Sequence, residues 1–189
     1  MYPYEGKFVI SKLYGTPAPA GMTYSAGKHP GADFVGRTNK NIHAVKSGYI
    51  YKTGYDDDGW GNFIVIAQTD GIFAIYCHLS KRVYKAGTSI RAGELIGIEG
   101  ETGMARGSHL HLEFRTDYTD KYATIDPCKY LNLEKKVDVT IMATISTDAQ
   151  AALKKLVRVG IISNTTYWVN IIPTVKNLDS LLIKIAAKL

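Results

Sequence analysis

The chain has 189 residues, a length that fits either one domain or two, because single hydrophobic cores usually serve about 100–200 residues. Its composition, 46% hydrophobic and 21% charged, is typical of a folded globular protein and argues against disordered, collagen-like or coiled-coil chains. Two cysteines, Cys77 and Cys128, are too few for a disulfide framework or a four-cysteine zinc site. Any metal site must therefore use histidine and carboxylate ligands.

The net charge of +6 is concentrated towards the C-terminus. Residues 1–134 carry 15 Lys and Arg against 14 Asp and Glu, a charge of +1, whereas residues 135–189 carry 8 against 3, a charge of +5. Such a basic segment favours an anionic partner, for example a cell-wall polymer, an anionic membrane or nucleic acid. A solvated, lysine-rich helix surface explains the same charge equally well.

The first seven residues lack the basic region and the apolar run that make up a secretory signal peptide. No run of about 18 apolar residues that would span a membrane occurs in the sequence. We therefore expect synthesis in the cytoplasm, without a signal peptide or a transmembrane segment. If the protein acts outside the cell, another factor must release it.

From residue 8 to about residue 115, the sequence predicts short strands separated by glycine-containing turns. In chain order, the strands are expected at residues 48–55, 62–68, 72–79, 94–98 and 109–115. Residues 69–71, Thr-Asp-Gly, are typical of a hairpin turn, so the strands on either side of them should pair antiparallel. This density of turns, without long helical periodicity, predicts a mainly β domain.

The pattern changes after Pro127. A linker rich in β-branched residues at 136–146 precedes two predicted helices. The first helix begins at the capping box of residues 147–150 and ends near Gly160, and the second covers about residues 175–189 with an apolar stripe. We therefore divide the chain into a β domain at 1–135, the linker, and a small two-helix module at 147–189.

Two histidine motifs contain candidate metal-binding and catalytic residues. His29 precedes Asp33 by four residues, and the Pro-Gly pair after His29 argues against a helix. We expect a loop that runs into a short strand and brings the two side chains together. The alternative is a turn that contains an incidental aspartate.

The second motif alternates polar and apolar residues at a period of two. His109, His111 and Glu113 should share one face of a strand, while the apolar residues between them face the core. Two imidazoles then project side by side into one site. Accidental pairing of exposed histidines on an edge strand is the alternative.

His78 ends the predicted strand 72–79, with Tyr76 expected on its face and Cys77 on the opposite face. A single histidine at such a position is more often a hydrogen-bonded structural residue than a catalyst. Its function therefore depends on which other histidines lie near it.

A catalytic zinc ion needs three nitrogen or oxygen ligands and an open position for water. His29, Asp33 and one member of the pair His109 and His111 provide such a set. The remaining imidazoles would orient the water, transfer its proton and stabilise an oxyanion. The residues therefore predict a hydrolase, and spacing leaves open which histidine of the pair is the ligand.

In their order along the chain, these motifs resemble the M23 family of zinc metallopeptidases, the lysostaphin-like or LytM-like peptidoglycan endopeptidases. The matching stretches are residues 29–33 (H-x-x-x-D), 76–79 (Y-x-H-L) and 109–113 (H-x-H-x-E). The resemblance covers about residues 6–131. It implies an antiparallel β-sheet domain of the LytM or lysostaphin type.

The resemblance also implies a role for each residue of the motifs. His29, Asp33 and His111 would be ligands of Zn²⁺, and His78 and His109 would be the catalytic pair. Because all five positions are present, the resemblance implies an active enzyme.

Three other positions stand apart from these motifs. Ser108 occupies a place where a proline is common in the family, and His43 has no role that the resemblance assigns. We expect His43 to be structural or at the surface. Tyr24 is compared with a tyrosine that helps to stabilise the transition state in some members.

The resemblance implies a zinc-dependent endopeptidase that hydrolyses amide bonds in the stem peptides or cross-bridges of peptidoglycan. A phage or prophage endolysin released by a holin, or a virion-associated lysin, is the expected setting. The C-terminal module would bind anionic wall polymers or form a dimer.

The alternative from another class is a non-catalytic wall-binding or phage virion structural protein that retains the peptidase fold. A nucleic-acid binder rests on charge alone and lacks a recognition motif, so we expect no nucleic-acid partner.

Overall fold

The computed structural model describes residues 1–18, 23–24, 26–133, 148, 151 and 183. The chain divides into two compact units, Met1–Leu131 and Asn132–Leu189. The first unit contains all the strands described below. The predicted linker at 136–146 and, apart from three positions, the predicted helices at 147–189 lie outside the described residues.

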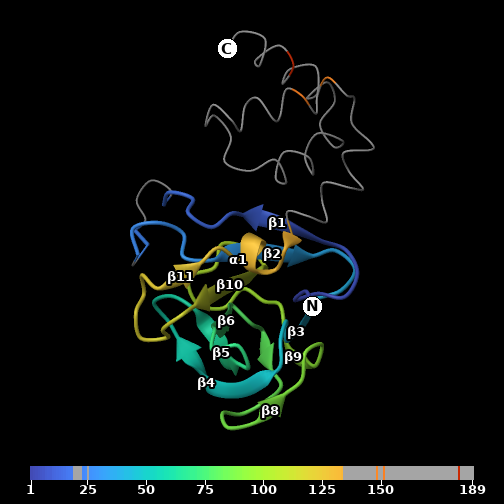
Figure 1. Cartoon of the computed structure of the whole chain (residues 1–189), viewed down its shortest axis with the longest axis vertical. Helices are drawn as coiled ribbons and strands as arrows, with labels where there is room; N and C mark the ends of the chain where they lie inside the picture. The colour runs from blue at the N-terminus through green and yellow to red at the C-terminus, as the bar shows by residue number, and fades with distance from the viewer. Residues whose placement is uncertain (19–22, 25, 134–147, 149–150, 152–182, 184–189) are drawn as a thin grey trace. The chain divides into compact units, whose positions relative to one another are not determined.

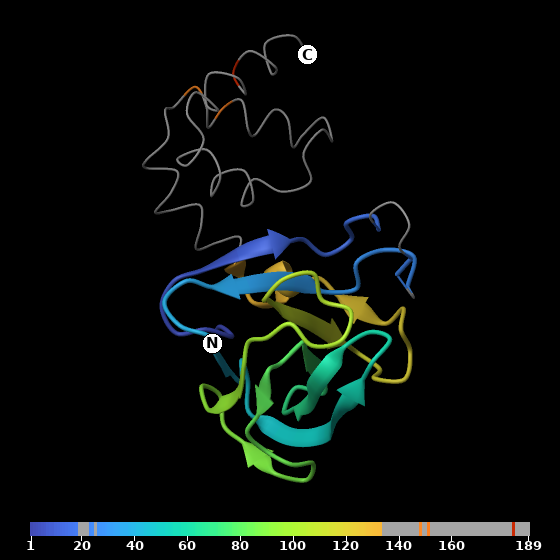
Figure 2. The same ribbon diagram turned by 180° about the vertical axis from the view of Figure 1, so that it is seen from behind.

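The first unit is built on an antiparallel sheet with the strand order β1-β2-β10-β6-β5-β4-β8, in which β11 also pairs with β10. Its strands are β1 (Phe8–Lys12), β2 (Ala32–Gly36), β4 (Gly48–Asp56), β5 (Gly61–Gln68), β6 (Phe73–Cys77), β8 (Ser89–Ile90), β10 (Leu110–Arg115) and β11 (Thr124–Ile125). Strands β1 and β8 lie at opposite ends of this sheet (Figure 1). Figure 2 shows from behind how strongly β4 curves at the end away from β1.

A smaller antiparallel sheet has the strand order β3-β9-β7. It consists of β3 (Asn41–His43), β9 (Leu95–Ile98) and β7 (Lys81–Arg82). One helical turn, α1 (Pro127–Tyr130), begins after Asp126, whose side chain accepts a hydrogen bond from the Cys128 amide. Within the part of the chain that the structure describes, no helix has the length and the apolar character that crossing a membrane requires.

The predicted mainly β, antiparallel fold is confirmed. Strands β5 and β6 pair antiparallel around the predicted turn, where Gly71 has a φ of +81° that favours glycine. The strands expected at 48–55, 94–98 and 109–115 are β4, β9 and β10. The strand expected at 72–79 is shorter than predicted, because β6 ends at Cys77.

Strand β10 is central to the sheet, since it pairs with β2 on one side and with β6 on the other. Its residues Leu110, Leu112 and Phe114 are completely buried and face the core, as the alternation predicted. The opposite face carries His111, Glu113 and Arg115, which are also buried. The edge-strand alternative is wrong, because the histidine motif lies inside the sheet.

A second apolar cluster lies on the face of the sheet that carries His111. It consists of Phe63, Val65, Ile75 and Cys77, which β5 and β6 contribute. The partly buried side chains of Trp60, Phe73 and Tyr118 pack against it. The polar row of β10 is therefore bordered by apolar side chains, which limits the access of water to it.

We expect Leu112→Ala to lower the free energy of unfolding by about 2–5 kcal/mol, because it leaves a cavity in the core beneath the central strand. The matched control is Leu95→Ala, at a leucine that is 36% exposed, for which we expect a clearly smaller loss. Denaturant unfolding followed by circular dichroism measures both. Equal losses in the two variants would contradict the burial of Leu112.

Candidate metal centre and active site

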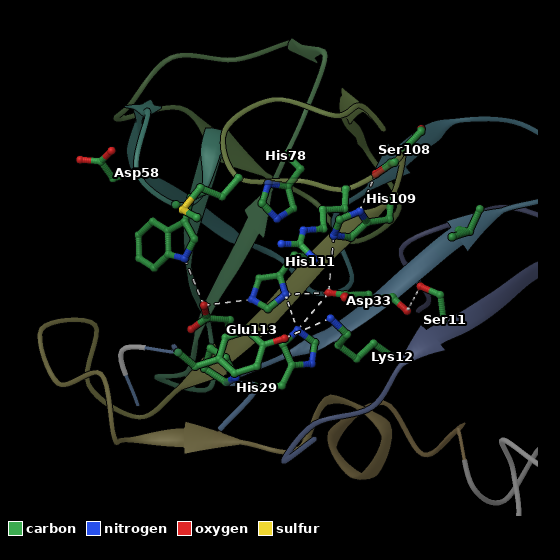
Figure 3. A pocket seen from close by; sticks show the side chains of 18 of the residues that line it. Ser11, Lys12, His29, Asp33, Asp58, His78, Ser108, His109, His111 and Glu113 are labelled. Carbon is green, nitrogen blue, oxygen red and sulfur yellow. Dashed lines mark hydrogen bonds and ion pairs between the residues drawn. The ribbon is translucent and has the colours of Figure 1, made fainter. Parts of the chain in front are cut away.

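The candidate site is assembled from segments far apart in the sequence. Strand β10 supplies His111, and the sheet register places Asp33 of β2 opposite it on one side and Cys77 of β6 on the other. Side chains at paired positions of antiparallel strands share a face of the sheet. Figure 3 shows His111 and Asp33 pointing towards each other on this face.

His29 reaches the same face from the loop before β2, as the sequence predicted. The loop is fixed to the preceding segment, because the His29 amide donates to the Thr16 carbonyl and the His29 carbonyl accepts from the Gly15 amide, both at 2.9 Å. At Gly31 the loop approaches β10 so closely that a Cβ would lie 2.4 Å from the Leu112 carbonyl oxygen. Glycine is therefore required where the loop carries His29 over the central strand.

Three atoms from this group converge on one point. His111 Nδ1 lies 2.8 Å from Asp33 Oδ1 and 3.0 Å from His29 Nε2, and His29 Nε2 lies 3.1 Å from Asp33 Oδ1. All three side chains are buried. Two imidazoles and one carboxylate form a donor set suited to a catalytic zinc ion, which keeps a further position for water.

In each of the rings of His29 and His111, one nitrogen points away from the place where the three atoms converge, and we call it the outer nitrogen. The hydrogen-bond acceptor beside the outer nitrogen determines which nitrogen carries the ring proton. His29 Nδ1 is 2.9 Å from the Leu13 carbonyl oxygen, and His111 Nε2 is 3.1 Å from Glu113 Oε1. Because a carbonyl oxygen and an ionised carboxylate only accept hydrogen bonds, both outer nitrogens carry protons. The neutral rings then turn lone pairs towards Asp33, so three acceptors face one another. This arrangement needs a cation or an additional proton, and it fits a divalent metal ion.

Glu113 is itself held by several donors. Its Oε2 accepts from Arg115 Nε at 2.8 Å and Nη2 at 2.6 Å, and its Oε1 accepts from Trp60 Nε1 at 3.2 Å. Burial alone would raise the pKa of Glu113, but the bonds to His111 and Arg115 lower it below its ordinary value. Glu113 is therefore an ionised acceptor that orients the ring of His111.

Without a metal ion, a proton occupies the centre. Burial disfavours the charged imidazolium, but the hydrogen bonds and charges of Asp33 and Glu113 outweigh it and raise the pKa of His111 to about 9. Burial opposes the ionisation of Asp33 too, yet the hydrogen bonds from His111 and His29 hold its pKa far below the usual range. A metal ion that binds here must displace the His111 proton.

His78 and His109 form a second pair beside the three converging atoms, with ring centres 4.7 Å apart. His78 Nδ1 lies 2.9 Å from the Thr102 carbonyl oxygen, and His109 Nδ1 lies 2.8 Å from the Gly107 carbonyl oxygen. Both rings therefore carry a proton on Nδ1 and a lone pair on Nε2 when neutral. His109 Nε2 lies 3.7 Å from Asp33 Oδ1, and Figure 3 shows both rings next to His111.

His78 is unprotonated at neutral pH. Its burial, together with the nearby charges of His111 and His109, lowers the pKa of His78 to about 4. The ring is consequently neutral, so its lone pair is available to accept a proton.

The expected orientation of His78 relative to its neighbours is wrong. His78 follows the end of β6 and has a φ of +63°, in the left-handed region that non-glycine residues seldom adopt. Tyr76 points into the core, where its hydroxyl accepts from the Val45 amide at 3.0 Å. Cys77, opposite His111, shares the face of the site instead. The backbone turn at His78 brings its ring to the same site.

These residues line a cleft of about 550 Å³. Its walls also contain Lys12, Tyr24, Trp60, Met104 and Arg106. The ring centres of Tyr24 and His29 lie 5.2 Å apart, and the Tyr24 hydroxyl accepts from Lys12 Nζ at 3.0 Å. The cleft thus has the volume typical of a ligand-binding site and has cationic and aromatic side chains in its walls.

His43 is not part of this site. It belongs to β3 in the smaller sheet, is buried, and has its Nε2 3.8 Å from Glu5 Oε1. Alternation in the sequence placed Glu113 beside the histidines, but Arg115 and Trp60, which donate hydrogen bonds to Glu113, were not predicted as site residues. Extending the alternation of β10 by two residues would have found Arg115, whereas Trp60 precedes another strand and gave no signal.

Comparison with known proteins identifies the family. The chain matches the family model described as Peptidase family M23 over residues 27–127. The chain belongs to peptidase family M23. Members of this family are metallopeptidases, in agreement with the donor set described above.

Two curated relatives show the range of this M23 peptidase's similarities. Glycyl-glycine endopeptidase ALE-1 of Staphylococcus capitis is 34% identical over 119 residues, which are 62% of this chain and 32% of ALE-1. Peptidoglycan DD-endopeptidase ShyC of Vibrio cholerae is 30% identical over 131 residues, which are 69% of this chain and 29% of ShyC. The chain thus spans about a third of the length of these relatives.

A solved structure supports the same assignment. The catalytic domain of lysostaphin from Staphylococcus simulans superimposes with a TM-score of 0.60 at 32% sequence identity. The match covers 66% of this chain and 92% of that domain. The LytM or lysostaphin type of fold expected from the sequence is therefore confirmed.

We expect Glu113→Gln to weaken zinc binding about 10- to 100-fold, because an uncharged amide holds the outer proton of His111 less firmly. Glu94→Gln, outside the cleft, is the matched control and should bind zinc like the parent. Competition with a chelator measures the affinity of both variants, after circular dichroism has shown that they are folded. Parental zinc affinity in Glu113→Gln would refute the proposed orienting role.

Zinc affinity should depend on pH, because the metal displaces the proton held by His111. With the pKa of His111 raised to about 9, we expect the apparent affinity to rise about tenfold per pH unit from pH 7 and to level off above about pH 9. Calorimetry in buffers of different ionisation enthalpy should register the release of about one proton at pH 7. An affinity that does not change between pH 7 and 9 would contradict this account.

Proposed function

We propose that this M23 peptidase is a zinc-dependent endopeptidase that hydrolyses amide bonds in the peptides of peptidoglycan. The observation that carries the proposal is the convergence of His29, Asp33 and His111 beside two further imidazoles whose lone pairs adjoin the same cleft. Zinc is the metal that best matches two imidazoles, one carboxylate and an open position. In this proposal His29, Asp33 and His111 hold the ion.

Lewis acidity, which makes a water molecule a stronger nucleophile, is the chemistry that a bound zinc ion supplies. His78 is neutral and its Nδ1 proton is donated to the Thr102 carbonyl, so its Nε2 accepts a proton from the attacking water. His109, fixed in the same way by the Gly107 carbonyl, stands beside it. Once protonated, either ring can stabilise the oxyanion or donate a proton to the leaving amine.

The substrate class is supported by the relatives and by the cleft. ALE-1 is named a glycyl-glycine endopeptidase and ShyC a peptidoglycan DD-endopeptidase, so both relatives are named as endopeptidases, one of them for peptidoglycan. The cleft of about 550 Å³ is large enough for several residues of an extended peptide. Mass spectrometry of fragments released from peptidoglycan of defined composition identifies the bond that is cut.

We propose in addition that residues 1–135 are the peptidase domain, joined by residues 136–146 to a helical module at 147–189. The charge of +5 over residues 135–189 supports a module that binds anionic wall polymers, and its apolar stripe supports dimerisation as the other role. The proposed setting is a phage or prophage lysin released by a holin, or a virion-associated lysin. A holin reading frame beside the gene would support the first setting.

Substitution of the histidines tests the catalytic proposal. We expect His78→Ala and His109→Ala to lower kcat about 10²- to 10⁴-fold while zinc binding remains within a few-fold of the parent, since neither residue is a proposed ligand. His111→Ala should lose both zinc and hydrolysis. The matched control is His43→Ala, which changes a histidine outside the cleft and should hydrolyse peptidoglycan like the parent.

Release of amine groups from purified sacculi, together with the zinc content of each variant, provides these measurements. If the zinc-loaded parent binds walls but releases no fragments from any wall tested, the enzymatic proposal fails. A non-catalytic wall-binding or virion structural role would then be the better explanation.

A further inference from the structure

Glu99 is a buried carboxylate that lies outside the metal centre. It follows β9, and its side chain is completely shielded from solvent. Its Oε2 accepts from the Tyr4 hydroxyl at 2.5 Å and the Gly36 amide at 2.9 Å. Its Oε1 accepts from Lys40 Nζ at 2.5 Å and from the Ser108 hydroxyl at 2.7 Å. Glu99 thus joins the N-terminal segment, the end of β2 and the residue that precedes His109.

The bond to Ser108 is one of three that close the loop of residues 100–109 at its base. The His109 amide donates to the Gly100 carbonyl at 3.0 Å, and the Gly107 amide donates to Glu101 Oε1 at 2.6 Å. Among these three hydrogen bonds, the one between Ser108 and Glu99 is the only one whose acceptor is a buried carboxylate that also binds residues outside the loop. Through these hydrogen bonds, Glu99 connects the end of the loop to the N-terminal segment and to β2.

This loop contains both carbonyl groups that orient the catalytic pair. The Thr102 carbonyl accepts from His78 Nδ1, and the Gly107 carbonyl accepts from His109 Nδ1. The middle of the loop is held by close backbone packing, because a Cβ on Gly103 would lie 2.3 Å from the Gly61 nitrogen. The second carbonyl group is held differently. The Gly107 carbonyl directly precedes Ser108, so its direction depends on the position of Ser108.

The chain at Gly107 has few other restraints. Gly107 has a φ of +100°, and nothing lies within 4 Å of where its Cβ would be. Glycine has more accessible backbone conformations than any other residue, and serine does not fix its own φ as a proline would. Two side-chain contacts restrain this part of the chain, the exposed one between the Gly107 amide and Glu101 and the more buried one between the Ser108 hydroxyl and Glu99. The second acts on the residue that directly follows the Gly107 carbonyl.

We propose that Glu99 is a positioning residue, which through Ser108 holds the Gly107 carbonyl against His109 Nδ1 and so keeps the His109 lone pair on Nε2. The catalytic consequence rests on the proposed function, whereas the effect on the His109 proton does not. The hydrogen bonds of Glu99 reach none of the side chains of His29, Asp33 and His111, whereas its bond to Ser108 ends one residue before His109. Loss of the hydrogen bond between Ser108 and Glu99 should therefore lower the reaction rate more than it lowers the zinc affinity.

The test compares Ser108→Ala with Ser108→Thr in the zinc-loaded full chain. Nitrogen-15 NMR of the imidazole side chains reports which ring nitrogen of His109 carries the proton. We expect the parent and Ser108→Thr to show the Nδ1 proton alone, and Ser108→Ala to show a mixture of the two tautomers. The kcat of Ser108→Ala should fall about 10- to 100-fold, with KM and zinc content little changed.

Two further variants complete the experiment. Glu99→Gln keeps the shape of the side chain but removes its charge, and it should shift the His109 tautomer in the same direction as Ser108→Ala. Ser80→Ala is the matched control, because the Ser80 hydroxyl donates to the main-chain carbonyl of Glu99 at 3.0 Å and not to its carboxylate. It should leave the tautomer of His109 unchanged.

An unchanged His109 tautomer and kcat in folded Ser108→Ala would overturn the proposal. So would a loss of zinc together with hydrolysis, since that result indicates a general structural role. A tautomer shift in a protein whose parent hydrolyses no peptide would support the positioning role of Glu99 and refute the proposed function. The two proposals therefore fail by different measurements.

Discussion

The site depends on the hydrogen bonds that four imidazoles make with their outer nitrogens. Three of these bonds end on backbone carbonyls, those of Leu13, Thr102 and Gly107, and the fourth ends on the carboxylate of Glu113. Because the outer nitrogen of each neutral ring carries the proton and donates it to one of these acceptors, the inner nitrogen keeps its lone pair. Two lone pairs converge with Asp33 and form a place for a cation, and the other two remain as bases beside it. All four rings are therefore oriented by the same kind of contact, and the convergence of two of them with Asp33 separates the proposed ligands from the proposed catalysts.

The sheet makes these contacts rigid. Strand β10 is paired on both sides, so His111 and Glu113 lie on a strand whose opposite face is anchored by Leu110, Leu112 and Phe114 in the core. The contact with His111 and the two hydrogen bonds from Arg115 to Glu113 Oε2 keep Glu113 ionised in a buried position, where an unpaired charge would be costly. The loop of residues 100–109 supplies the other acceptors and is tied to the domain through Glu99. Strand and loop therefore position different halves of the same site.

Short-range patterns predicted much of this arrangement. Alternation at a period of two placed the residues of β10 on their correct faces, and the Pro-Gly pair after His29 predicted the loop that leads into β2. Contacts with backbone carbonyls had no sequence signal, because every residue has the same carbonyl group. The left-handed backbone of His78 was missed for a similar reason, since such a conformation is expected at glycine. Glu99 could not be recognised either, because its partners Tyr4 and Gly36 lie 95 and 63 residues away in the sequence.

The most direct test of this account is a crystal structure of the zinc-loaded chain with anomalous scattering measured at the zinc absorption edge. The account predicts one strong peak at the point where His29 Nε2, Asp33 and His111 Nδ1 converge, with the outer nitrogens of both rings still bound to the Leu13 carbonyl and to Glu113. A zinc ion held through His111 Nε2, or held by His109 in place of His111, would contradict it.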